Sequence, residues 1–166
     1  MKYPDNYPYI EPCPGCFENF LLKLKGLGGN HMFMSNGDFT LFRFMVAMAK
    51  MFPGCTIRVC VYCLMEETVE KAKKLLEENK VSLIVFYYNR TGFDISVYKD
   101  VKNLAMYEVD AVAYYVQAEL NSALFTVTGV TQQGLPSRNV EVFTYIGDID
   151  QQIMLRKAFI RQLKKH

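Results

Sequence analysis

The sequence is poor in histidine, the side chain that carries much of the acid–base chemistry near neutral pH. Of its 166 residues, only His31 and His166 are histidine. Met32 and Phe33 follow His31, and His166 is the last residue of the sequence. No histidine is therefore followed two positions later by a lysine, and the sequence contains no H-x-K motif.

Glycine-rich nucleotide loops and long apolar runs are also missing. The sequence has neither G-x-x-x-x-G-K-[ST] nor G-x-G-x-x-G, the loops that hold phosphates on backbone N–H groups, and we expect no cofactor. The apolar stretch FTLFRFMVAMAKMF contains Arg43 and Lys50 and is too short to cross a bilayer, so we expect no membrane partner. MKYPDNYPYIEPCPG has proline and aspartate where a secretion signal is apolar, which favours a cytoplasmic protein.

Neither charge nor cysteine dominates the composition. The net charge is +2 at pH 7, so nucleic-acid binding would require a local basic patch rather than a basic protein. Five cysteines are an odd number and too few for a disulfide scaffold, which favours reduced thiols. A hydrophobic fraction of 51% over this length suits one domain with a substantial core.

Alternating strand and helix patterns predict an α/β fold. We expect a mixed, mostly parallel sheet with helices on both faces and an antiparallel hairpin near the C-terminal end. The helix that precedes Pro53 should begin with Asp38 as its cap. The expected strands are 30–35, 56–63, 81–88, the hairpin strands AVAYYV and ALFTVTG joined by QAELNS, and 139–147. The expected helices are 17–25, 38–52, 66–79, 94–106 and one that begins near Asp148.

Four prolines separate the N-terminal end from the rest of the chain. Pro4, Pro8, Pro12 and Pro14 block both helix and central strand. The sequence therefore predicts an N-terminal arm with a short helix over residues 1–27, and a single α/β domain over residues 28–166.

The order of these elements, with NGDFTLFRFMVAM and TGVTQQGLPSRNVEVFTY, resembles a single phospholipase-D-like half domain. It is most similar to the small nuclease-like type carried by phages and prophages. The resemblance implies a signature H-x-K-x4-D on the first hairpin strand, followed by a G-S-x-N-like segment. In that family the histidine is the nucleophile, and the lysine and asparagine hold the phosphate oxygens.

The resemblance puts Asp110 or its neighbour at the histidine position and Val112 at the lysine position. Gly129 fits the small residue that follows the hairpin, and Thr131 or Gln132 falls near the asparagine. Valine cannot hold a phosphate oxygen, and aspartate is a poor substitute for imidazole beside an anion. The first hypothesis is therefore a domain that lost catalysis, is encoded by a phage or mobile element, and acts as a binding or structural protein.

Two partners follow from this first hypothesis. Active sites of the family form between two half domains, so the resemblance implies a homodimer. Nucleic acid is the other candidate, through basic residues that could contact phosphates. An ordinary solvated helix with cations near its C-terminal end explains most of the same residues. The candidate contacts are Arg138, Arg156, Lys157, Arg161, Lys164 and Lys165.

Two alternative functions stay open, and with them the question whether the chain is an enzyme. One is an active phosphodiesterase or nuclease with substituted groups, although Asp110 has no convincing acid–base partner because Glu119 is expected in the hairpin turn. The other is a small zinc-containing interaction module based on Cys13 and Cys16 in a C-x2-C turn. Zinc normally takes four ligands, and an N-terminal turn with two thiols explains the same residues.

Overall fold

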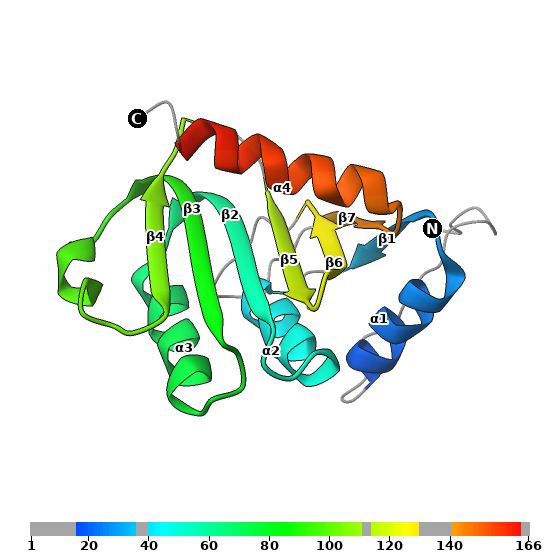
Figure 1. The fold of residues 1–166 in the computed structure, drawn as a ribbon, viewed down its shortest axis with the longest axis horizontal. Helices are drawn as coiled ribbons and strands as arrows, with labels where there is room; N and C mark the ends of the chain where they lie inside the picture. The colour runs from blue at the N-terminus through cyan, green and yellow to red at the C-terminus, as the bar shows by residue number, and fades with distance from the viewer. Residues whose placement is uncertain (1–15, 36–39, 111–113, 130–140, 164–166) are drawn as a thin grey trace.

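A computed structural model describes residues 16–35, 40–110, 114–129 and 141–163 of the chain. Seven strands form one sheet with helices on both faces (Figure 1). The elements in chain order are α1 (Cys16–Leu27), β1 (Asn30–Ser35), α2 (Leu41–Met51), β2 (Thr56–Leu64), α3 (Glu66–Glu77), β3 (Leu83–Thr91), the 3-10 helix η1 (Ile95–Tyr98), β4 (Leu104–Glu108), β5 (Tyr115–Leu120), β6 (Ala123–Thr128), β7 (Glu141–Ile146) and α4 (Ile149–Leu163).

The strand order across the sheet is β1-β7-β6-β5-β2-β3-β4. The predicted α/β class and mixed sheet are confirmed. Five of the seven described strands run in one direction, because β5 and β7 alone are reversed. Two of the six described pairings, β2 with β3 and β3 with β4, are parallel. The C-terminal hairpin adds to the other side of β2 by antiparallel pairing, so β2 is a central strand with both kinds of neighbour.

The main core lies on the face of the sheet that α2 and α3 cover, and α4 crosses the opposite face (Figure 1). Alternation along the strands divides the side chains between these faces. On β5, Val116 and Ala118 enter the main core, whereas Gln117 between them faces α4. Burying one large apolar side chain stabilises the fold by about 1.5–3 kcal/mol. The α2–α3 face therefore supplies most of the apolar stabilisation.

Helix α1 is part of this core. Phe17, Leu21 and Leu24 are almost fully buried, and the Phe17 ring meets the Phe44 ring of α2 at a centroid distance of 5.0 Å. Lys50 Nζ lies 2.9 Å from Glu18 Oε1 and adds an exposed ion pair between α1 and α2. Residues 16–27 thus pack with the α/β domain, and the rest of the predicted arm, residues 1–15, lies outside the described residues.

The predicted helix at 94–106 is wrong. Asp94 caps a single 3-10 turn, η1, by accepting a hydrogen bond from Ser96 N at 2.9 Å. Tyr98 is buried and donates to Glu70 Oε1 at 2.6 Å, which fixes this turn against α3. Asn103 then takes a φ of 63°, and the chain continues as β4 in parallel with β3. The turn ends at Tyr98, and the residues that follow Asn103 join the sheet instead of continuing a helix.

The hairpin lies further along the chain than predicted. Its first strand is Tyr115–Leu120 rather than 111–116, and Glu119 belongs to the strand rather than to the turn. Asn121 and Ser122 form the two-residue turn with φ values of 49° and 70°. Two positive φ angles are typical of a type I′ turn, whose twist matches that of the flanking strands. The expected connector QAELNS is therefore mostly strand.

The remaining elements follow the predictions within a few residues at their ends. The cap of α2 is Thr40, two residues after the predicted Asp38, and its hydroxyl accepts from Arg43 N at 3.3 Å. Asp38, the predicted cap, lies outside the described residues.

Gly129 should tolerate no side chain. Its φ is +85°, and a Cβ there would lie 2.6 Å from the carbonyl oxygen of Val142. We expect Gly129→Ala to lower the free energy of unfolding by about 1–3 kcal/mol in urea denaturation, because the backbone would be strained and the contact would have to open. Gly26→Ala in α1, where nothing lies within 4 Å, is the matched control and should change it by less than about 1 kcal/mol, in the stabilising direction. Equal effects at both sites would contradict this geometry.

Candidate functional site

Asp110, the predicted counterpart of the catalytic histidine, lies just after β4 and is exposed. It lines a cavity of about 460 Å³ with Asn89, Glu108 and Val109. Val109 N donates to Tyr88 O at 2.8 Å, so the pairing with β3 extends one residue beyond the end of β4. The described lining carries two carboxylates and no cation. An acidic cavity of this kind repels a phosphodiester rather than holding it.

Most other predicted site residues fall outside the part of the chain that the structure describes. Gly129 is described, and its backbone N donates to Tyr114 O at 2.9 Å beside the hairpin. Cys16 begins α1, but its side chain is not described, nor is that of Arg161 in α4. The residues outside the described ranges are Val112, Thr131, Gln132, Arg138, Lys164, Lys165 and Cys13.

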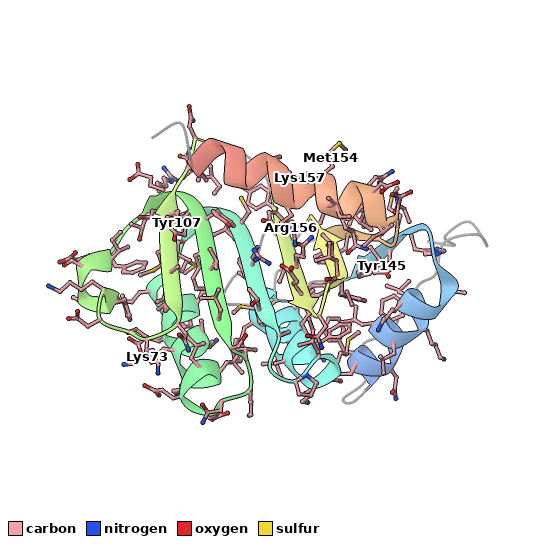
Figure 2. All side chains as sticks on the ribbon, in the orientation of Figure 1. Lys73, Tyr107, Tyr145, Met154, Arg156 and Lys157 are labelled. Carbon is pink, nitrogen blue, oxygen red and sulfur yellow. The ribbon has the colours of Figure 1, made fainter. Side chains whose placement is uncertain are left out.

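The predicted basic residues of α4 separate within one turn. Arg156 reaches back to the sheet, where its Nη1 lies 2.6 Å from Glu119 Oε1. Lys157 is exposed and shares a shallow hollow of about 310 Å³ with Asp150 and Met154. Figure 2 shows Arg156 on the sheet side of the helix and Met154 on its outer side. The two cations therefore do not form one surface for a phosphate backbone.

A buried polar ladder of Gln117, Thr126 and Gln152 lies between the sheet and α4. These side chains come from β5, β6 and α4, and each is at most 3% exposed. Gln117 Nε2 donates to Thr126 Oγ1 at 2.8 Å and to the Gln152 carbonyl at 3.4 Å. Thr126 Oγ1 donates to Gln152 Oε1 at 2.8 Å. Gln117 Oε1 is buried and has no hydrogen-bond partner within the described ranges, which is unusual for a buried polar atom.

An ion cluster of Arg58, Glu119 and Arg156 lies beside the ladder. Arg58 Nη1 donates to Glu119 Oε2, and Arg156 Nη1 donates to Glu119 Oε1. The side chains are 18%, 21% and 31% exposed, so the cluster is half-buried but reachable by solvent. Arg156 Nε is buried and has no hydrogen-bond partner among the residues that the structure describes. Two guanidiniums thus converge on one carboxylate and leave a formal charge of +1.

Tyr115 and Tyr87 complete the polar part of this face. Tyr115 begins β5 and is 2% exposed, and burial raises the pKa of its phenol well above the usual value. Burial also raises the pKa of Tyr87, although Arg58 beside it acts in the opposite direction. Both phenols therefore stay protonated near neutral pH. Neither phenol is therefore an ionised nucleophile, and neither carries the positive charge that would hold a phosphate oxygen.

His31 lies far from this face. It belongs to β1 at one end of the sheet, and its Nε2 lies 2.6 Å from the carbonyl oxygen of Gly28. Its ring stacks on Tyr145 at a centroid distance of 6.5 Å. Among the described residues, no three His, Cys, Asp or Glu side chains gather as metal ligands would.

Sequence reasoning missed the ladder and the ion cluster. Arg58 inside the apolar strand TIRVCVYC was the available signal, because a half-buried guanidinium requires an acceptor. Within the described part of the chain, no helix combines the length and the apolar character that crossing a membrane requires.

The comparisons with known proteins bear on the fold. No family model matches the chain, and no curated protein matches it either. Among solved structures, NucT from Helicobacter pylori is similar, with a TM-score of 0.55 at 11% sequence identity. The match covers 81% of this chain and 95% of NucT. The chain has a phospholipase-D-like fold. At this identity the likeness concerns the fold alone.

Thr126→Val should expose the ladder's contribution to stability. The change removes the hydroxyl that accepts from Gln117 and donates to Gln152. We expect the free energy of unfolding to fall by about 1–3 kcal/mol in urea denaturation, because two buried polar groups lose a partner. Thr128→Val is the matched control on the same strand, since its hydroxyl makes one long bond of 3.4 Å to Thr144 O. A larger loss for the control would argue against a ladder that stabilises the fold.

Cys55 and Cys60 should react slowly with Ellman's reagent in the native protein. Burial raises the pKa of Cys55 to about 11 and that of Cys60 to about 12, so little thiolate is present near neutrality. In a variant with Cys13, Cys16 and Cys63 changed to Ser, labelling should speed up as the pH rises toward these values. Native-state stability should fall over the same range, above the pKa of about 8.5 of an unfolded thiol. Rapid labelling near neutral pH would contradict this burial.

Proposed function

We propose that this chain is a phospholipase-D-like domain that has lost phosphodiester hydrolysis and acts by binding. The likeness in fold to NucT, a phospholipase-D-family nuclease, supports the domain type. The loss of catalysis follows from the residues that stand at the expected catalytic positions of this chain. A mobile-element origin and a cytoplasmic setting belong to the same proposal, and the unbridged thiols of Cys55 and Cys60 suit a reducing compartment.

The proposal places the catalytic signature on β5 rather than at Asp110 and Val112. The first hairpin strand begins at Tyr115, and residues two apart on a strand share a face. H-x-K-x4-D counted from Tyr115 puts Gln117 at the lysine position and Ser122, in the hairpin turn, at the aspartate position. The segment then continues through β6 to Gly129, the small residue that follows the hairpin.

The buried ladder is the observation that carries the proposal. At the two positions that would hold imidazole and ammonium groups stand a protonated phenol and a neutral amide. Gln117 is fully buried and bonded to Thr126 and to Gln152 of α4, so the place of a phosphate is filled by the protein's own side chains. Electrostatic stabilisation of a phosphoryl group needs preorganised cations or N–H donors, which this pair does not offer.

Binding then replaces catalysis, with a second copy of the chain and nucleic acid as proposed partners. Active sites of the phospholipase-D-like family form between two half domains, so we expect this chain to form a homodimer. The molar mass in solution measures its oligomeric state. Lys157 is the described cation of the predicted patch that remains available for a phosphate backbone. Arg156 is turned toward the sheet and paired with Glu119, so it is not part of that exposed patch.

The decisive test is an assay of phosphodiester hydrolysis. Purified wild-type protein should hydrolyse neither bis(p-nitrophenyl) phosphate nor single-stranded DNA above the rate of a Gln117→Leu variant. Hydrolysis by the wild type that disappears in Asp110→Ala would instead support an active enzyme with substituted groups.

The binding arm of the same test uses labelled single-stranded DNA in a salt titration. Affinity should fall as salt rises, with a slope of about 0.7 per neutralised phosphate in the logarithmic plot. Lys157→Gln should weaken binding. Lys74→Gln changes an exposed lysine of α3 and the net charge equally, and it should leave binding unchanged. No binding at low salt would remove nucleic acid as a partner.

A further inference from the structure

Two arginines from distant parts of the chain grip one carboxylate. Arg58 belongs to β2 and Arg156 to α4, and each donates through Nη1 to a different oxygen of Glu119 on β5. Arg58 and Glu119 lie 61 residues apart in the sequence, and Arg156 and Glu119 lie 37 apart. The two guanidiniums therefore bracket a single planar group that offers two oxygens.

The cluster has more donors and more positive charge than Glu119 can satisfy. Arg156 Nε is buried without an acceptor in the described part of the chain, and the cluster keeps a formal charge of +1. A buried N–H without an acceptor costs stability, so Arg156 Nε gains when a further acceptor binds beside it. The surplus therefore points to an oxyanion larger than the carboxylate of Glu119.

We propose that Arg58 and Arg156 form an oxyanion-binding site, suited to a phosphate group, which Glu119 occupies from within the chain. Guanidinium forks match carboxylate and phosphate geometry alike, so Glu119 stands where two phosphate oxygens would bind. The site is open to solvent at its edge, because Arg156 is 31% exposed. A phosphate group binds when it displaces this carboxylate, either as free phosphate or as part of a polynucleotide backbone.

This site goes beyond the proposed function and does not depend on it. Glu119 lies nearer the C-terminal end of β5 than Tyr115 and Gln117, the positions of the lost catalytic pair. The site does not require that pair to be inactive. Failure of the hydrolysis test therefore leaves it standing, and absence of phosphate binding leaves the loss of catalysis standing.

The test measures the affinity of three proteins for inorganic phosphate by isothermal titration calorimetry. Glu119→Gln removes the competing charge and should bind phosphate at least about tenfold more tightly than the wild type, the range of one or two charge-assisted hydrogen bonds. Glu67→Gln is the matched control. It changes the net charge equally and releases Lys71, which lies 2.6 Å from Glu67 on α3, but it creates no converging pair. Its phosphate affinity should equal that of the wild type.

Glu119→Asp separates geometry from net charge. It withdraws the carboxylate by one methylene and keeps its charge, so it should gain several-fold in phosphate affinity even if Glu119→Gln folds poorly. Adding Arg58→Gln to either variant should abolish the gain. Equal gains in Glu67→Gln, or no gain in both Glu119 variants, would overturn the proposal.

Single-stranded DNA in the same titration identifies the source of the phosphate. A gain for Glu119→Gln with DNA that exceeds the gain with inorganic phosphate assigns the site to a polynucleotide backbone. A gain with inorganic phosphate alone assigns it to a free phosphate or phosphomonoester. Both outcomes support the oxyanion site.

Discussion

The antiparallel pairing of β5 with β2 decides which side chains lie beneath α4. Gln117 stands opposite Arg58, and Glu119 stands opposite Thr56. Because side chains alternate along a strand, a slip of one residue would turn Gln117 and Glu119 into the apolar core on the other face. The main core resists such a slip, since Val116 and Ala118 already fill it. The apolar face thus fixes the register, and the register places the ladder and the ion cluster.

Helix α4 is held differently from the other helices. Helices α1 and α2 are anchored by apolar side chains that no solvent reaches, whereas α4 contacts the sheet through the polar Gln152 and Arg156. Net contributions of neutral hydrogen bonds are about 0.5–1.5 kcal/mol each, less than the burial of one large apolar residue. Through its described side chains, the attachment of α4 therefore depends on hydrogen-bond geometry and on the Arg156–Glu119 ion pair.

Local patterns predicted most elements, but not the contacts of the site. The strand at 30–35 and the helix beginning at Glu66 were readable because periodicity and i,i+4 charge pairs are local signals. The sequence did not predict β4, because its five half-buried or exposed residues show little hydrophobic periodicity. It also misplaced the hairpin turn, because Asn121 and Ser122 stand where such a turn usually has a glycine. The partners Arg58, Glu119 and Arg156 come from three elements, so only the sheet order could bring them together.

A crystal structure of the wild-type chain soaked with tungstate, a phosphate mimic, tests the central claim most directly. The account predicts that Gln117 remains bonded to Gln152 beneath α4, and that no tungstate is held by a histidine. Tungstate held between His31 and a lysine, from one copy or across two, would show a catalytic centre assembled from distant residues and would contradict the loss of phosphodiester chemistry.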